Sequence, residues 1–367
     1  MRLLLTGATG FVGGAVAAAL AARGLLPHTV FLVRAATAEA GAARVQDSLA
    51  RFGLSRQDAP VHPMQVIVGD LTRPDTFAGE PGFEGVTHVI HCAALATFSN
   101  NPAIWAHNVD GTLALARAVH ARSPGLQRWL QVGTAMCCGP GLPSPVVESW
   151  DAGRDADAHL VPYTRSKLAA ELALRELPGF PLVVARPSIV VGHSVLGTAP
   201  SPSIFWVFRM AFALERFTCA PDERVDIIPV DWCADVLVAL LLARGLRHDL
   251  YHVAAGAQSS RFDEIDAAYA AANGTAPILP RYEQVAVDRL RELVPLFEQR
   301  LGRVNRLLIL RALTLYGAFA ELNYVFDSSR LVAEGIAPAP RFVDYIGVCV
   351  SSSTSVPITE QMAADFK

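Results

Sequence analysis

A glycine-rich turn near the N-terminus constrains the fold of this chain more than any other feature. The stretch TGATGFVG, Thr6 to Gly13, joins a short apolar run to an alanine-rich segment that extends to Arg23. Its three glycines permit a tight turn, close approach of the backbone to a pyrophosphate, and close packing of helix on strand. The helix N-terminus would face the phosphates. The pattern predicts a dinucleotide site, with these residues at the cofactor: Gly7, Thr9, Gly10, Phe11, Val12 and Gly13.

The same region contains an uncharged run, Leu3 to Ala22, so a signal peptide or a membrane span has to be considered. Glycines and threonines interrupt the run, and it divides fully into a strand, a turn and a helix. We therefore expect it to belong to a folded domain.

Strands and helices are predicted to alternate along the first half of the chain. Apolar runs predict strands at 2–6, 29–34, 65–70, 87–92, 128–133 and 181–186, with helices at 11–23, 39–52, 102–122 and 164–177. This alternation predicts an α/β fold, a Rossmann-type doubly wound parallel sheet.

The pattern changes after residue 186, where glycine and proline are dense from 187 to 202. We expect a Rossmann domain from 1–186 plus about 226–255, and a smaller, mostly helical substrate lobe from about 187–225 plus 256–350. The tail 351–367, which opens with SSSTS, is expected to be loosely ordered.

Composition excludes some partners and compartments. The net charge is -3 and the pI is near 6.4, so the chain has no general attraction for nucleic acid. Six cysteines form no C-x-x-C pair and no cluster with histidine, which favours a reduced, cytoplasmic protein without a metal site.

The end of the second predicted strand bears on the choice of cofactor. A carboxylate there would accept hydrogen bonds from a ribose hydroxyl and favour NAD, whereas this chain has Arg34. A guanidinium suits a 2′-phosphate, so NADPH is favoured over NAD, with Arg44 as a second phosphate contact. Asp70 and Leu71 end the third strand, where a carboxylate can meet the adenine amino group.

A tyrosine and a lysine four residues apart, Tyr163 and Lys167, stand at the start of a predicted helix. Only Lys167 and Lys367 are lysines, so this spacing is rarely met by chance here. On a helix the two side chains share one face, and an ammonium would lower the phenol pKa toward the range useful for acid and base catalysis. Thr134, just after a strand, can hold a substrate carbonyl.

Together these motifs resemble the extended short-chain dehydrogenase/reductase superfamily over residues 1 to about 255. The resemblance implies that Thr134 orients a carbonyl, that Tyr163 exchanges the proton and that Lys167 lowers the Tyr163 pKa. Asn108, in HNVDGT, matches the asparagine on the helix that supports the proton relay. RPSIVVG resembles the superfamily loop whose backbone lies against the nicotinamide and implies cofactor contacts by Pro187, Ser188 and Val190. HCAALATF resembles the strand-four loop of a narrower group of reductases and implies contacts by Ala93 and Ala94.

A narrower resemblance links the chain to fatty acyl-CoA reductases and to the thioester reductase domains of carboxylic acid reductases and peptide synthetases. It rests on LVRAATAEAGAARV, which carries Arg34 and Arg44, on DIIPVDWCADVLV, and on LNYVFDSSRL followed by FVDYIGVCV. It implies NADPH-dependent reduction of an acyl-CoA or acyl-carrier-protein thioester to an aldehyde or an alcohol.

Other functions share these residues. A nucleotide-sugar epimerase or dehydratase uses the same Tyr, Lys and Thr in a redox-neutral cycle, although Arg34 argues against it. A hydroxysteroid or dihydroflavonol type of carbonyl reductase is a third possible function. A non-catalytic NADPH-sensing protein would have no need of the tyrosine.

Two features leave alternatives open. Cys137 and Cys138 either form a covalent acyl intermediate or are buried for packing. The segment from Arg281 to Arg311 holds seven arginines against four acids. It could contact coenzyme A phosphates or a membrane surface, or form amphipathic helices with solvated arginines. A homodimer and peripheral membrane contact both remain open.

Overall fold

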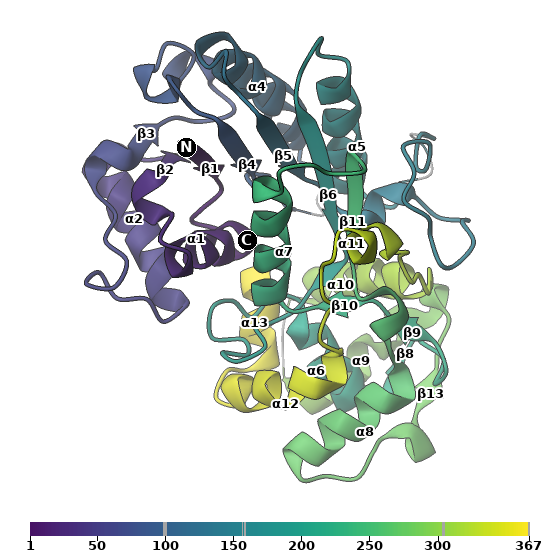
Figure 1. Ribbon diagram of the computed structural model, residues 1–367. Coiled ribbons are helices and arrows are strands. Elements are labelled where there is room, and N and C mark those ends of the chain that lie inside the picture. The colour runs from purple at the N-terminus through teal and green to yellow at the C-terminus, as the bar shows by residue number, and fades with distance from the viewer. Residues whose placement is uncertain (98–100, 156, 158, 303–304, 366–367) are drawn as a thin grey trace.

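The fold is a seven-stranded parallel sheet with a second, mostly helical lobe below it (Figure 1). The computed structural model describes residues 1–97, 101–155, 157, 159–302 and 305–365. The sheet order is β11-β6-β5-β4-β1-β2-β3, and every pairing in it is parallel. The strands are β1 Leu3–Thr6, β2 Thr29–Val33, β3 Val66–Val68, β4 His88–His91, β5 Arg128–Val132, β6 Leu182–Pro187 and β11 Leu250–Val253.

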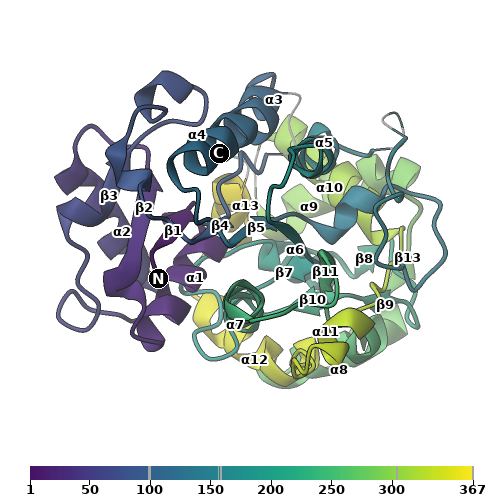
Figure 2. The same cartoon turned by 45° about the horizontal axis from the view of Figure 1, so that its top comes forward.

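Helices cover both faces of this sheet, as the alternation of strands and helices predicted (Figure 2). On one face the apolar core joins β1 and β2 to α1 Phe11–Ala22, α2 Ala38–Arg51 and α7 Val230–Leu242. On the other face it joins the sheet to α4 Gly111–Arg122 and α5 Pro162–Arg175. Successive strand residues point to opposite faces, so Leu3 and Leu5 lie in the first core and Leu4 in the second. The doubly wound Rossmann fold is confirmed.

The uncharged N-terminal run forms β1, the glycine turn and α1. No helix among the described residues combines the length and the apolar character needed to cross a bilayer.

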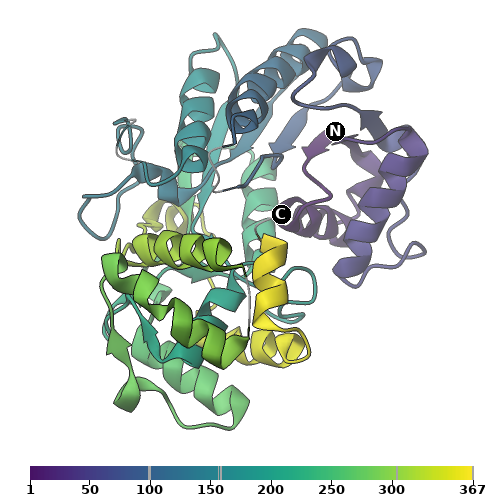
Figure 3. The same cartoon turned by 180° about the vertical axis from the view of Figure 1, so that it is seen from behind.

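The second lobe has its own apolar core, and its helices lie together below the sheet (Figure 3). Its helices are α6 Phe205–Leu214, α8 Phe262–Asn273, α9 Val294–Leu301, α10 Arg306–Ala320, α12 Phe342–Ser353 and α13 Ile358–Asp365. Short strands complete it: β7 Ile189–Val190, β8 Arg216–Phe217, β9 Arg224–Val225, β10 Ile227–Ile228, β12 Ser260–Arg261 and β13 Glu283–Gln284.

The chain after residue 324 differs from the sequence-based expectation in two places. Residues near α11 Ser329–Ala333 return to the sheet, where Leu331 joins the core of β1, α1 and α7 and Glu334 accepts a hydrogen bond from the Tyr251 hydroxyl. The expected loose tail contains the end of α12 and then α13, which buries Met362 at 1% exposure. Ile358 and Met362, one turn apart on α13, pack on the core of the second lobe, so this segment is ordered despite the polar SSSTS at its start.

Four of the described arginines in the arginine-rich segment form ion pairs. Arg281 and Arg300 both face Glu215, with N···O distances of 2.9 and 3.5 Å. Two further pairs, Arg289–Glu292 and Arg306–Glu298, close at 2.9 and 2.7 Å. Arg303 lies outside the described residues. This pairing favours amphipathic helices with carboxylate-bound arginines.

Candidate active site

A polar cleft opens at the carboxyl ends of β1, β2, β3 and β4. In parallel α/β sheets this edge is where ligands bind. Nine residues predicted at the cofactor line it: Gly7, Thr9, Gly10, Arg34, Arg44, Asp70, Leu71, Ala93 and Ala94. Six more residues complete the lining: Thr6, Leu32, Val33, Gly69, Cys92 and His107.

The glycine turn fits a dinucleotide because side chains have no room there. Gly7 has φ +75°, a conformation that favours glycine. A Cβ at Gly13 would lie 2.1 Å from the Gly7 carbonyl oxygen, so α1 packs directly on the turn. Gly10 is the N-cap of α1 and makes no side-chain cap bond, so the first amides of the helix point to the cleft. Phe11, Val12 and Gly13 begin α1 and do not line the cleft.

Arg34 and Asp70 lie close together at the ends of β2 and β3. Burial alone would raise the pKa of Asp70, but hydrogen bonds from the Thr72 amide and hydroxyl, together with the charge of Arg34, lower it overall. Arg44 donates a hydrogen bond to the Arg34 carbonyl oxygen. The cleft therefore carries two exposed guanidinium groups and an ionised carboxylate at one end.

A buried chain of hydrogen bonds fixes the loop after β4. The Thr6 hydroxyl lies 2.8 Å from His91 Nδ1, and His91 Nε2 lies 2.9 Å from the Thr112 hydroxyl. Thr6 also accepts from the Ala93 amide at 3.1 Å. Burial lowers the pKa of His91 well below its usual range, so the imidazole is neutral. Sequence reasoning missed this network, although Thr6 belongs to the glycine motif and His91 to HCAALATF.

Asn108 holds the same loop from the other side. It lies in a π-helical turn, Ala106–Asp110, between the short helix α3 Ala103–Trp105 and α4. Its Oδ1 accepts from the Leu95 amide at 2.7 Å, and its Nδ2 donates to the Ser166 hydroxyl at 3.0 Å. Asn108 thus ties the β4 loop to α5. Phe98, the last residue of HCAALATF, lies outside the described residues.

Tyr163 and Lys167 stand one turn apart on α5, as the spacing predicted. Pro162 begins the helix at its first position, where the missing N–H costs nothing. Lys167 is 3% exposed, and burial lowers its pKa while Glu171 opposes that change. Burial raises the pKa of Tyr163 to about 12, and Cys137 and Glu171 add to the rise. This differs from the expected lowering, because the loss of water around the phenol disfavours its charged form. Tyr163 is therefore a neutral phenol at pH 7.

A buried ion pair lies beneath these residues. Glu171, one turn after Lys167, accepts from Arg186 Nε at 2.9 Å, and both side chains are fully buried. Glu171 also crowds the backbone before Thr134, since a Cβ at Gly133 would lie 2.0 Å from Glu171 Oε1. Arg186 donates to the Ser149 carbonyl at 3.0 Å. The Glu171–Arg186 pair therefore supports α5, the end of β5 and the loop at Ser149, which the sequence motifs did not reveal.

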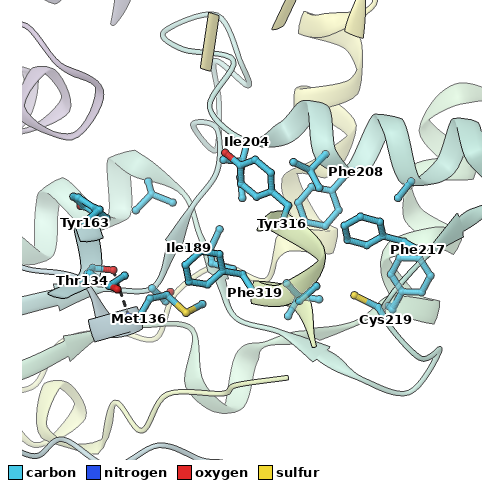
Figure 4. Close-up of a pocket in the computed structure, with 18 residues that line it drawn as sticks. Thr134, Met136, Tyr163, Ile189, Ile204, Phe208, Phe217, Cys219, Tyr316 and Phe319 are labelled. Atoms are coloured by element: carbon cyan, nitrogen blue, oxygen red, sulfur yellow. Dashed lines mark hydrogen bonds between the residues drawn. The ribbon is translucent and has the colours of Figure 1, made fainter. Parts of the chain in front are cut away.

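An apolar cavity of about 220 Å³ opens beside Tyr163 (Figure 4). Thr134 lies at this end of the cavity, and its hydroxyl accepts from the Met136 amide at 3.3 Å, which leaves the O–H to donate. Ser188 and Val190, predicted at the cofactor, line this cavity with Ile189. Pro187 lies at the end of β6, paired with Val253, and lines neither the cleft nor the cavity.

The vicinal cysteines are packing residues in this structure. Cys137 and Cys138 are 0% and 3% exposed. Burial raises the pKa of both thiols, that of Cys138 to about 12. A nucleophilic cysteine requires the thiolate, so the geometry disfavours a covalent intermediate here. The described residues also contain no group of three or more side chains placed to hold a metal ion.

The sheet order, the glycine turn and the Tyr-Lys helix define the class of the protein. It is an NAD(P)-dependent oxidoreductase of the extended short-chain dehydrogenase/reductase type. The chain belongs to the male sterility protein family, whose model matches residues 5–237.

Relatives and solved structures agree with this placement. An aldehyde reductase of Aspergillus flavus, lnaA, is 30% identical over 260 residues, which is 65% of this chain and 24% of the relative. A non-canonical nonribosomal peptide synthetase of Cladobotryum, FrzA, is 26% identical over 321 residues, 80% of this chain and 30% of the relative. The chain thus spans between about a quarter and a third of these relatives. The terminal R domain of the myxalamid PKS-NRPS pathway has the same fold, with a TM-score of 0.75 at 23% identity, over 96% of this chain and 90% of that one.

Proposed function

We propose that this chain is an NADPH-dependent reductase of acyl thioesters, carried by coenzyme A or by a carrier protein. The observation that carries the proposal is the cavity that begins at Thr134 and Tyr163. None of the described side chains lining it is charged. A sugar or a nucleotide would leave its polar groups unpaired there, at a cost of about 1–3 kcal/mol each, whereas an acyl group would not.

The cleft residues would hold the cofactor. The amides of the glycine turn and of the first turn of α1 would bind the pyrophosphate, and Arg34, with Arg44, would bind the 2′-phosphate. Asp70 would accept from the adenine amino group. When bound, NADPH would supply a hydride to the thioester carbonyl carbon.

The chain's own residues would handle the proton. Tyr163 carries its proton at pH 7, as a proton donor in the reductive direction must, and burial raises its pKa further, to about 12. Its hydroxyl would protonate the carbonyl oxygen, while the Thr134 hydroxyl donates a hydrogen bond to the same oxygen. Lys167 would keep positive charge near that oxygen, and Asn108 would hold the β4 loop against α5. The resulting hemithioacetal would release a thiol and an aldehyde.

The test is an assay of purified protein by NADPH absorbance with acyl-CoA and acyl-pantetheine substrates, with products identified by mass spectrometry. Loss of one NADPH per aldehyde formed is expected, and two per alcohol if a second reduction follows. A uridine-sugar converted without net loss of NADPH would overturn the proposal in favour of an epimerase. Reduction of a steroid or flavonoid ketone, with no reduction of thioesters, would favour a hydroxysteroid or dihydroflavonol type of carbonyl reductase.

A further inference from the structure

The apolar cavity is elongated, with the two ends made of different residues (Figure 4). Thr134, Met136 and Tyr163 lie at one end, and Phe217 and Cys219 lie at the other. We propose that it holds an unbranched aliphatic tail, and that Phe217 and Cys219 set the longest tail that it accepts. This inference rests on the proposed function, because it assigns the substrate of the same site.

The walls favour an aliphatic tail over an amino-acid or peptide tail. They include β7, α6 and α10. The lining residues on the two helices are Val207, Phe208, Ala211, Tyr316, Phe319 and Ala320. Each methylene buried against such walls strengthens binding about fourfold, which is about 0.8 kcal/mol. An amide against these helices would lose its hydrogen bonds to water, and of the six helix residues only Tyr316 carries a polar group.

Hydrogen bonds hold the backbone at the far end of the cavity. Phe217 and Cys219 are 4% and 6% exposed. The Phe217 carbonyl accepts from the Val285 amide at 2.8 Å, and the Cys219 carbonyl accepts from the Tyr282 hydroxyl at 2.8 Å. Both ends of this short segment are hydrogen-bonded to residues 282–285 of the same chain. It cannot move aside for a longer tail without breaking those bonds.

The volume gives the expected length. An apolar cavity of about 150 Å³ holds benzene, which has six carbon atoms. On this scale the cavity of about 220 Å³ would hold about nine carbons. Tails of about eight to ten carbons should therefore fill it.

The experiment is a series of straight-chain acyl-CoA and acyl-pantetheine thioesters, from butanoyl to hexadecanoyl, assayed for kcat/KM. The value should rise about fourfold per methylene and then stop rising at about eight to ten carbons, with the same limit on both carriers. Cys219→Leu should move the limit down by about two carbons, since its side chain has two more heavy atoms at the far end. Cys219→Ala, which adds none, is the matched control and should not shorten the limit.

A binding measurement separates this inference from the proposed function. Straight-chain fatty alcohols of increasing length, titrated in the presence of NADPH and followed by calorimetry, should show the same limit and the same shift in Cys219→Leu. Binding with this limit but no thioester turnover would sink the proposed function and keep the inference. Turnover without a length limit, or a limit unmoved by Cys219→Leu, would overturn the inference alone. If Cys219→Leu fails to fold by circular dichroism, Cys219→Val makes the same test with a smaller shift.

Discussion

The polar cleft and the apolar cavity are built in opposite ways. The cleft comes from the ends of four consecutive strands of one sheet, and its lining residues fall between positions 6 and 107. The cavity draws on residues from 134 to 320 and on both lobes. Between them stands α5, with Tyr163 at the cavity and Lys167 buried behind it. A cleft built from one continuous part of the chain thus adjoins a cavity built from separate segments.

The largest effect on activity is expected at Tyr163, which lies at the cavity. Tyr163→Phe removes the proton donor while keeping the ring, so kcat/KM for thioester reduction should fall by about 10²- to 10⁴-fold. NADPH affinity, measured by fluorescence titration, should stay near the wild-type value. Turnover close to wild type would show that another group delivers the proton.

The second largest effect is expected at the buried Glu171–Arg186 ion pair. Glu171→Gln leaves Arg186 buried without its counter-charge, so the free energy of unfolding should fall by about 3–5 kcal/mol in urea titrations. Glu171→Gln should also lower the pKa of both Tyr163 and Lys167, because the Glu171 carboxylate raises both pKa values in the wild-type protein. Reduction requires the protonated phenol, so the alkaline limb of the kcat/KM profile should move to lower pH.

Glu176→Gln, at an exposed position just after the same helix, is the matched control and should change neither quantity. A purely structural role for Glu171 would lower kcat/KM equally at every pH, and that outcome would contradict the electrostatic account.

A smaller effect should be confined to the cleft. Arg34→Ala removes a charge-assisted hydrogen bond to the 2′-phosphate, worth about 1.5–3 kcal/mol, so NADPH should bind about 10- to 150-fold more weakly. NADH binding should change little and serves as the internal control. Equal weakening of both cofactors would mean that Arg34 does not read the phosphate.

The smallest effect should come from the glycine turn. Gly13→Ala places a Cβ 2.1 Å from the Gly7 carbonyl oxygen and forces α1 away, which should weaken binding of either cofactor by about 1–3 kcal/mol. Gly125→Ala, where a Cβ meets nothing within 4 Å, is the matched control. Unchanged affinity in Gly13→Ala would show that the turn tolerates movement of the helix.

The same contrast explains what the sequence could predict. Gly7, Arg34 and Asp70 are predictable because each follows a strand, and parallel strands bring such residues to one edge. Tyr163 and Lys167 are predictable because a helix brings positions four apart to one face. The Glu171–Arg186 pair and the end wall at Phe217 and Cys219 are contacts between distant segments, and no local pattern encodes them. The pKa of Tyr163 depends on burial, which the spacing does not report.

The central claim is that hydride and proton meet at a thioester carbonyl placed at the open end of an apolar cavity. The most direct measurement uses NADPH carrying deuterium at the transferable position, with a decanoyl thioester as substrate. The account predicts an aldehyde with one deuterium at its carbonyl carbon, formed by the wild type and nearly lost in Tyr163→Phe. An unlabelled product, or a thioester left intact while a nucleotide sugar is converted, would contradict it.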